Sequence, residues 1–184
     1  GPTTRALPDD GRAAAPGAGE LGRVARPGRT PIGYYKDEAK SAQTFVVIEG
    51  ERYPIPGDYA TVEADGTVTL LGRGSQCINT GGEKVYPEEV EECLKLHPTV
   101  ADAAVVGVPD DKWGEAITAL VEPHAGDVVD AAELIAHVKE RLAAYKAPKQ
   151  VVAVASIGRA ANGKLDYKQL RSDAIGAPSA GARA

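Results

Sequence analysis

Two short apolar runs on either side of a tight turn form the clearest local pattern in the chain. Residues 59–63 and 67–71 are rich in β-branched and apolar side chains, and Asp65-Gly66 lies between them. An Asp-Gly pair in this position favours a β-hairpin, because glycine readily adopts the positive φ that a tight turn requires. The pattern therefore predicts two antiparallel strands joined at residues 64–66.

Upstream of this hairpin the hydrophobic pattern is weaker. Residues 21–25 and the β-branched run 44–48 predict short strands, and residues 37–43 predict one or two helical turns. Residues 1–19 are rich in Pro, Gly and Ala and have no periodicity, so we expect them to be loose unless a partner domain covers them.

Downstream, the pattern changes to alternating helices and strands. It predicts helices at 87–96, 131–144 and 165–172 and strands at 101–108, 116–122 and 151–155. The first helix starts with Pro87 and has acidic residues in its first turn, and both features are favourable at a helix N-terminus. The second helix has a buried side formed by Leu134, Ile135, Val138 and Leu142. These elements predict a small α+β domain with a three-stranded sheet and helices.

A glycine-flanked passage, Gly72-Arg73-Gly74-Ser75, separates the two parts. Glycine permits large changes in backbone dihedral angles, so this passage is suited to a flexible connection. We therefore predict a β-rich part over residues 1–72 and a second domain over residues 73–184.

The composition excludes several classes of protein. A chain of 184 residues with 26% charged and 43% hydrophobic residues is typical of a soluble globular protein. Its net charge of −5 argues against a general nucleic-acid surface, and no apolar run approaches the roughly 20 residues that a membrane helix needs. Cys77 and Cys93 lack zinc-site spacing, which predicts no metal site and reduced thiols in a cytoplasmic protein. The histidines are scattered, and none is predicted to be catalytic: His97, His124 and His137.

Charged residues border the predicted hairpin at both ends. Asp58 follows Gly57, and its carboxylate could accept hydrogen bonds from both hydroxyls of a ribose, although Gly-Asp alone is more typical of a turn. Arg73 has a planar guanidinium that suits a ribose or phosphate edge, whereas an isolated arginine is usually a solvated charge. Ser75 lies beside a glycine and could mark a hinge, and an ordinary loop serine fits equally well.

Three further features could bind a ligand. Gly81-Gly82-Glu83 would let a ligand approach the backbone, although a glycine pair usually marks a turn. Trp113 is the only tryptophan, and its charged neighbours favour a partly buried anchor. Lys164 follows Gly163, and its long ammonium arm could neutralise two anions together; a surface lysine is the alternative. The glutamates of the helix after the glycine pair are expected to form a solvated face: Glu88, Glu89, Glu91 and Glu92.

The order of these motifs resembles the C-terminal end of the acyl-CoA synthetases, a branch of the adenylate-forming enzymes. The resemblance rests on residues 57–92, on the segment around Trp113 and on Asn162-Gly163-Lys164, and it covers residues 20–172. Within it, residues 78–91 are similar to actinobacterial fatty-acid and steroid-side-chain CoA ligases. The family fold implies the last strands of a large N-terminal domain, followed by a whole small lid domain.

The resemblance implies roles at the nucleotide. Asp58 would bind the ribose of ATP, with Arg73 beside it, and Ser75 would occupy the hinge of the lid. Lys164 would be the catalytic lysine that brings the carboxylate and the α-phosphate together. The chain departs from the family in carrying Pro56 before Gly57-Asp58, Ser75 where many relatives have Asp, and no proline in the segment before Gly163-Lys164.

The resemblance also implies roles at coenzyme A. Gly81, Gly82 and Glu83 would line the tunnel for the pantetheine arm, and Trp113 would lie beside that arm. Tyr145 would stack on the adenine of coenzyme A, and Lys149 would meet its phosphates. Ala147 stands where some relatives have a basic residue.

The implied activity joins a carboxylic acid of fatty or steroid-side-chain type to coenzyme A, with ATP and Mg²⁺ as further participants. The parts of the family that grip the ATP phosphates and the acyl group precede this segment, and the chain has no Met and begins with Gly1-Pro2. We therefore expect a fragment that works with its own N-terminal domain and is inactive alone. Two alternatives are transfer to a carrier-protein phosphopantetheine and a non-catalytic regulatory module.

Overall fold

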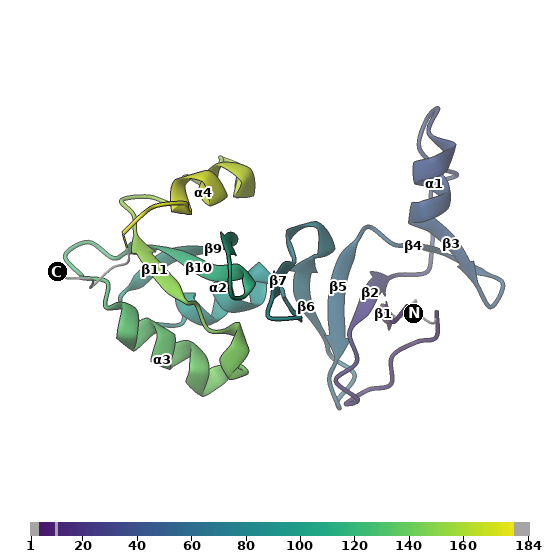
Figure 1. Cartoon of the computed structure of the whole chain (residues 1–184). Helices are drawn as coiled ribbons and strands as arrows, with labels where there is room; N and C mark the ends of the chain where they lie inside the picture. The colour runs from purple at the N-terminus through teal and green to yellow at the C-terminus, as the bar shows by residue number, and fades with distance from the viewer. Residues whose placement is uncertain (1–3, 10, 179–184) are drawn as a thin grey trace. The chain divides into compact units, whose positions relative to one another are not determined.

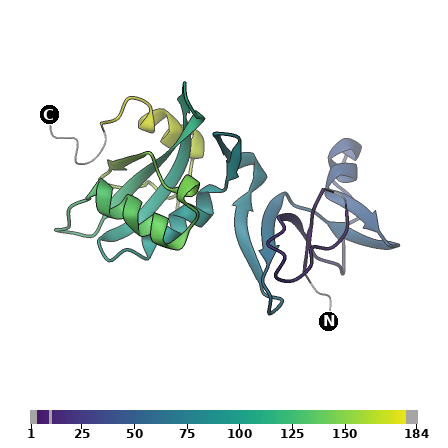
Figure 2. The ribbon, with the colours of Figure 1, turned by 60° about the horizontal axis from the view of Figure 1, so that its bottom comes forward.

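The computed structural model describes residues 4–9 and 11–178 of the chain. The backbone divides into two compact units, Gly1–Ser75 and Gln76–Ala184, which are coloured from purple to teal and from teal to yellow in Figures 1 and 2. The expectation drawn from Gly1-Pro2 falls outside the described residues. Among the helices in the described part, none is long and apolar enough to cross a membrane.

The first unit is built on an antiparallel sheet with the order β1-β2-β5-β6. The predicted hairpin is confirmed, and the turn at Gly66 has a φ of 85°. Asp58 lies directly opposite Arg73 in its register. The strands span Arg5–Leu7, Gly22–Ala25, Asp58–Val62 and Val68–Arg73.

The prediction that residues 1–19 are loose was wrong for the part that forms β1. Ala6 and Leu7 are buried, and Leu7 pairs with Arg23 across the ladder. Gly22 makes this pairing possible, because a Cβ there would lie 2.5 Å from the Leu7 nitrogen. A strand of three residues is too short to show a period of two in the sequence.

A helical turn and a second small sheet complete the first unit. The predicted helix and strand are confirmed as α1, Glu38–Thr44, and β3, Phe45–Ile48. Asp37 caps α1 by accepting a hydrogen bond from the Lys40 N–H at 2.9 Å. β3 pairs with β4, Glu51–Pro54, which the sequence analysis did not predict. A small apolar cluster in this unit contains Leu7, Ala25, Tyr53 and Ile55.

The second unit has one five-stranded sheet with helices, which confirms the predicted α+β class. The predicted number of strands, three, was too low. The three predicted strands correspond to β9, β10 and β11, and β10 pairs with β9 antiparallel and with β11 parallel. Two short strands extend the sheet, because β7 pairs with β10 at Thr80 and β8 pairs with β7. The strands span Ile78–Thr80, Glu83–Val85, Val100–Asp110, Gly114–Pro123 and Gln150–Ala153.

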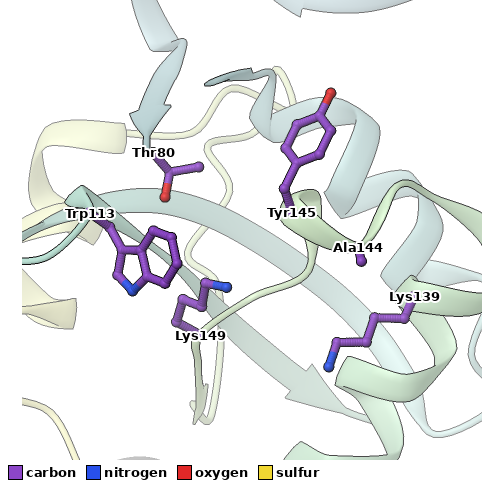
Figure 3. A pocket seen from close by; sticks show the side chains of 6 residues that line it. All are labelled: Thr80, Trp113, Lys139, Ala144, Tyr145 and Lys149. Carbon is purple, nitrogen blue, oxygen red and sulfur yellow. The ribbon is translucent and has the colours of Figure 1, made fainter. Parts of the chain in front are cut away.

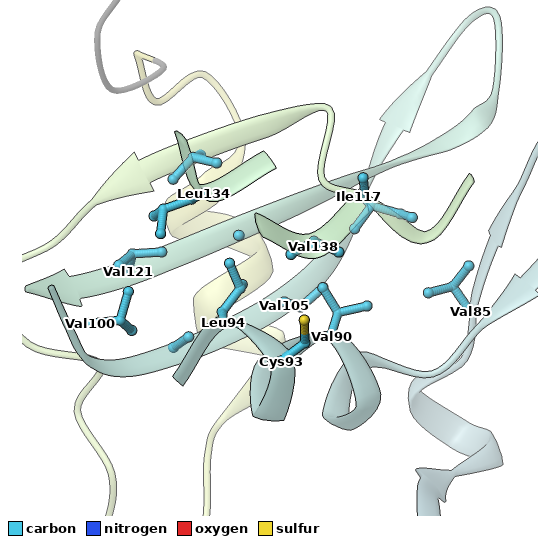
Figure 4. Close-up of a cluster of buried hydrophobic side chains, with 14 of the residues drawn as sticks. Val85, Val90, Cys93, Leu94, Val100, Val105, Ile117, Val121, Leu134 and Val138 are labelled. Carbon is cyan, nitrogen blue, oxygen red and sulfur yellow. The ribbon is translucent and has the colours of Figure 1, made fainter. Parts of the chain in front are cut away.

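The helices of this unit cover both faces of the sheet. The largest core cluster joins one sheet face to α2, Pro87–Lys95, and α3, Ala131–Arg141 (Figure 4). A second cluster joins the other face to α4, Tyr167–Ala174. The alternate residues of β9 serve the two clusters, with Ala103 and Val105 in the first and Ala104 and Val106 in the second.

Local caps set the ends of two helices that the sequence placed differently. α3 ends at Arg141 because Leu142 is extended, with φ −124° and ψ 164°. α4 starts at Tyr167, two residues later than predicted, because Asp166 accepts hydrogen bonds from the Lys168 and Gln169 N–H groups at 3.1 Å. An Asp followed by a helical pattern is a typical N-cap signal, and it identifies this start better than the apolar spacing does.

The core cluster around α2 predicts a sharp difference between two leucines. Leu94 is 0% exposed and Leu96 is 72% exposed. We expect Leu94→Ala to lower the free energy of unfolding by about 2–5 kcal/mol, because it leaves a cavity in the core. Leu96→Ala is the matched control, with a change within about 0.5 kcal/mol. Urea unfolding followed by circular dichroism measures both, and equal effects would contradict the described packing.

Candidate functional site

Asp58 and Arg73 form an ion pair at one end of the hairpin. The Arg73 Nε donates to Asp58 Oδ1 at 3.2 Å, and the pair is partly exposed. The carbonyl of Gly57, whose φ is 95°, accepts a hydrogen bond from the Gly74 N–H at 3.2 Å. The two predicted nucleotide residues therefore lie together on neighbouring strands, where a carboxylate and a guanidinium present both signs of charge.

The glycine pair and the tryptophan also lie together, within the second unit. The Gly81 N–H donates to the Trp113 carbonyl at 2.8 Å. A Cβ on Gly81 would lie 3.0 Å from Trp113 Cε3, whereas Gly82 has open space around it. Both glycines have positive φ, 60° and 88°. Gly81 is therefore required for close approach to the indole as well as for the turn.

An open cavity of about 350 Å³ lies beside this tryptophan (Figure 3). The structure brings three predicted residues to its wall, Trp113, Tyr145 and Lys149. Tyr145 belongs to the 3-10 helix η2, Ala144–Lys146, and Lys149 immediately precedes β11. The remaining wall residues are Thr80, Lys139 and Ala144.

The cavity combines aromatic rings with positive charge. The Lys149 ammonium lies 4.6 Å from the centroid of the Trp113 ring, and the Lys139 side chain reaches the cavity from α3 (Figure 3). A second ammonium, that of Lys112, lies 4.8 Å from the same centroid. Two planar rings and two wall lysines, Lys139 and Lys149, suit an anionic ligand that carries an aromatic base.

Three wall residues were missed by the sequence analysis, and two of them, Thr80 and Lys139, are polar. Thr80 is 4% exposed, and among the described residues its Oγ1 has no hydrogen-bond partner. A buried hydroxyl without a partner is unfavourable, so a ligand or water that bonds to it is expected at this wall. Lys139 lies in the last turn of α3, where a lysine is common for helix stability, and nothing in the sequence distinguished it.

Other predicted residues lie apart from this cavity. Glu83 is exposed in β8 and is not among its wall residues. Ser75 lies in the 3-10 helix η1, Gly74–Gln76. Ala147 is 2% exposed in the apolar core, so this position does not offer a side chain to a ligand.

Lys164 is exposed at the end of a tight turn. The Ala160 N–H donates to the Lys164 carbonyl at 3.0 Å, and Gly163, whose φ is 77°, donates its N–H to the Ala160 carbonyl at 2.7 Å. The Lys164 N–H donates to Asn162 Oδ1 at 3.1 Å. The backbone is thus fixed while the ammonium arm extends into solvent.

The predicted solvated face of α2 was wrong for Glu89 and Glu91, and Glu88 is half-buried with its Oε2 inaccessible. Glu89 pairs with Lys146 at 2.6 and 2.7 Å, which attaches η2 to α2. Glu91 is 4% exposed and accepts hydrogen bonds from the Val105 N–H at 2.9 Å and from the Tyr167 hydroxyl at 3.0 Å. The prediction holds for exposed Glu92. Helical spacing offered a signal, because Glu91 lies four residues after buried Pro87 and three before buried Leu94.

Burial raises the pKa of Glu91 to about 7, and the hydrogen bonds from Val105 and Tyr167 only partly oppose this shift. Burial also raises the pKa of Tyr167 above its usual range, and the neighbouring Glu91 and Glu88 carboxylates act in the same direction. Among the described residues, no group of three or more His, Cys, Asp or Glu could hold a metal ion. Cys77 and Cys93 are free thiols, and burial raises the pKa of each.

Residues 89–164 match the AMP-binding enzyme C-terminal domain family. The chain is 55% identical over 165 residues to a medium/long-chain-fatty-acid–CoA/3-oxocholest-4-en-26-oate–CoA ligase of Mycolicibacterium smegmatis, covering 90% of this chain and 30% of that protein. It is also 55% identical over 166 residues to a 3-oxocholest-4-en-26-oate–CoA ligase of Rhodococcus rhodochrous, with the same coverage of both. The chain thus spans about 30% of the length of these curated relatives.

Solved structures with similar folds include two synthetases of different activity. The amide bond synthetase McbA of Marinactinospora thermotolerans has a TM-score of 0.80 and 33% identity, over 93% of this chain and 34% of that one. The o-succinylbenzoate CoA synthetase of Bacillus subtilis, in complex with an acyl-adenylate, has a TM-score of 0.77 and 33% identity, over 92% and 34% of the two chains.

The packing of Gly81 against the only tryptophan predicts a measurable contrast within the glycine pair. We expect Gly81→Ala to lower the free energy of unfolding by more than about 1 kcal/mol and to shift the Trp113 emission, because it combines backbone strain with a clash. Gly82→Ala is the control, since it carries the strain without the clash and should leave the emission unchanged. Urea unfolding and fluorescence test both, and identical emission shifts would contradict the described contact.

The raised pKa of Glu91 predicts a pH-dependent stability. The folded state holds a proton on Glu91 between pH 4.5 and about 7 that the unfolded state has released. The free energy of unfolding therefore falls as pH rises through this window, by at most about 1.4 kcal/mol per pH unit. We expect Glu91→Gln to flatten this slope and Glu92→Gln to retain it. Urea unfolding from pH 4.5 to 8 is the measurement, and equal slopes in the two variants would contradict the assignment.

Proposed function

Because residues 89–164 belong to the AMP-binding enzyme C-terminal domain family, and the chain as a whole is homologous to the C-terminal part of acyl-CoA ligases, we propose that it contributes the mobile lid of an ATP-dependent acyl-CoA synthetase. The single observation that carries the proposal is the arrangement of the second unit. It presents an aromatic, lysine-lined cavity and, on a separate turn, the exposed Lys164. Such a unit can serve two steps in succession.

In the first step the enzyme forms an acyl-adenylate and releases pyrophosphate. The carboxylate of the acid and the α-phosphate of ATP repel one another as they approach. An ammonium between them offsets this repulsion, and the exposed arm of Lys164 suits that role. Asp58 accepts the ribose hydroxyls, and Arg73, which is already paired with Asp58, orients the carboxylate and lies at the nucleotide edge.

In the second step coenzyme A attacks the activated carbonyl and displaces AMP. The Gly81-Gly82-Glu83 loop and Trp113 flank the pantetheine arm. Because Gly81 has no side chain and packs closely on the indole, it leaves the backbone accessible to that arm. Tyr145 stacks on the adenine, and Lys149 contacts a phosphate. The cavity fits this ligand, because its wall offers rings, ammonium groups and the buried hydroxyl of Thr80.

The change between the two steps requires the lid to turn. We propose a hinge at Ser75, where the chain passes from the first unit to the second. The boundary that the sequence predicted after residue 72 falls within β6, which continues to Arg73. The lid then works against the enzyme's own N-terminal domain. Mg²⁺, when bound, would neutralise charge on the ATP phosphates. Among the described residues no group of three or more His, Cys, Asp or Glu could hold it, and we propose that its protein ligands belong to the N-terminal domain. We propose a cytoplasmic enzyme.

The acid substrate is proposed from the relatives. Those that are 55% identical to this chain are named for medium- or long-chain fatty acids and for 3-oxocholest-4-en-26-oate. A fatty or steroid-side-chain acid is therefore the proposed substrate class.

The acceptor has a second candidate. The similarity to an amide bond synthetase favours an amine as an alternative to coenzyme A, and a carrier-protein phosphopantetheine remains the thiol alternative. A comparison of free coenzyme A, a holo-carrier protein and a simple amine separates these acceptors. Product formation with the carrier or the amine alone would contradict the proposed use of coenzyme A. A non-catalytic module is disfavoured by the joint presence of Asp58, Arg73 and Lys164.

The role of Lys164 predicts a split between the two steps in the full-length enzyme. We expect Lys164→Ala to lower the rate of pyrophosphate release by about 10²–10³-fold, because the developing charge loses its counter-ion. Thioester formation from supplied acyl-adenylate should remain within about twofold of the unmodified enzyme. Lys168→Ala, which removes another exposed lysine four residues away, is the control. Unchanged pyrophosphate release in Lys164→Ala would refute the role.

A further inference from the structure

Two sets of side-chain hydrogen bonds, here called ties, hold the turn that carries Lys164. The first tie is formed by Arg159, at the N-terminal end of the turn. The Arg159 guanidinium forms a fork with Asp102, with Nε to Oδ2 at 2.6 Å and Nη2 to Oδ1 at 2.8 Å. The same guanidinium donates from Nη1 to the Gly163 carbonyl at 3.3 Å and from Nη2 to the Ala103 carbonyl at 3.3 Å. Arg159 therefore bonds both to strand β9 and to the residue immediately before Lys164.

The second tie is formed by Tyr167, at the C-terminal end of the turn. Tyr167 is the first residue of α4, three residues after Lys164, and its hydroxyl donates to Glu91 Oε1 at 3.0 Å. Glu91 Oε1 also accepts the Val105 N–H at 2.9 Å. The second tie thus joins α4 to α2 and, through Glu91, to strand β9.

The two ties fix the direction of the turn rather than the attachment of its helix. Leu170 and Ala174 are buried against the apolar face of the sheet, and Arg171 pairs with Glu115 of β10 at 3.0 Å, so α4 is attached to the sheet without the two ties. Burial of a carboxylate is unfavourable, and an apolar pair of the same volume avoids that penalty. The raised pKa of Glu91 reflects this cost. Hydrogen bonds, unlike apolar contacts, are directional.

We propose that Asp102 and Glu91 are positioning residues for Lys164, acting through Arg159 and Tyr167. The inference rests on the proposed role of Lys164 in acyl-adenylate formation. The Lys164 arm is exposed, so the place of its ammonium depends on the backbone that the two ties hold. Neither carboxylate touches a substrate in this scheme. Each helps to fix the position of the Lys164 backbone, from which the side chain extends toward the reacting groups.

The test uses the full-length enzyme and measures the two steps separately. We expect Tyr167→Phe and Arg159→Lys each to lower kcat for pyrophosphate release about tenfold to hundredfold, because small displacements of a catalytic group have effects of this size. KM for ATP, and thioester formation from supplied acyl-adenylate, should stay within about twofold. A purely structural role would lower both steps together.

Two substitutions at Glu91 sharpen the test. Glu91→Gln should retain most of the rate of pyrophosphate release, because Oε1 accepts the Val105 hydrogen bond and the shorter of the two Tyr167 hydrogen bonds, at 3.0 Å against 3.2 Å to Oε2. Glu91→Leu removes this acceptor and should lower the rate to the level of Tyr167→Phe. Glu92→Gln is the matched control on the same helix, where the exposed carboxylate pairs only with Lys95 among the described ion pairs.

The outcomes separate this inference from the proposed function. If Lys164→Ala abolishes pyrophosphate release while Tyr167→Phe and Arg159→Lys leave it unchanged, the positioning inference is wrong and the proposed function stands. If Lys164→Ala has no effect, the proposed function fails first. If Tyr167→Phe lowers the rates of pyrophosphate release and of thioester formation equally, the Tyr167–Glu91 hydrogen bond has only a structural role and the inference is wrong.

Discussion

The second unit depends on one constraint: the central strands of its sheet are apolar on both faces, so both faces must be covered. Residues 103–106 of β9 are buried in succession, as are residues 117–121 of β10. α2 and α3 cover one face, and α4 covers the other. α4 begins three residues after Lys164, so its packing on the second face of the sheet also fixes the position of the turn that carries Lys164.

Much of this architecture could be predicted because its elements are long or locally signalled. The hairpin in the first unit is specified by Asp65-Gly66, and α2 by Pro87 and its acidic first turn. β9 and β10 are long apolar runs, so their existence was clear although their ends were not. The motifs around Asp58, the glycine pair and Trp113 were likewise visible as short local patterns.

Features that arise only from tertiary packing were not predicted. β7 and β8 have three residues each, too few to display a strand period, and they exist because β10 offers β7 a partner at Thr80. Lys139 resembles any lysine in the last turn of a helix, and its place beside the cavity depends on how α3 packs. Glu91 is different, because its helical position marked the buried face and only its charge suggested solvent.

The functional candidates in the second unit follow a common physical logic. Thr80 lies on the wall of the cavity, and the buried or half-buried Glu91 and Asp102 bond to Tyr167 and Arg159, which flank the exposed Lys164 turn. The exposed groups supply charge and reach, and the inner groups limit where they can go. The proposed lid, which would present two different surfaces in turn, would benefit from this division, because each surface would keep its shape while the whole unit moves.

The contact between Gly22 and β1 has a consequence for the first unit as an object in solution. β1 is the outermost strand of its sheet, and a missing carbon at Gly22 is what lets it lie there. Loss of residues 5–7, by proteolysis for instance, would leave the backbone of β2 as a bare, unpaired edge and uncover part of the Tyr53 cluster. Open edges of this kind recruit strands from other molecules. Such clipping would therefore favour self-association of the protein.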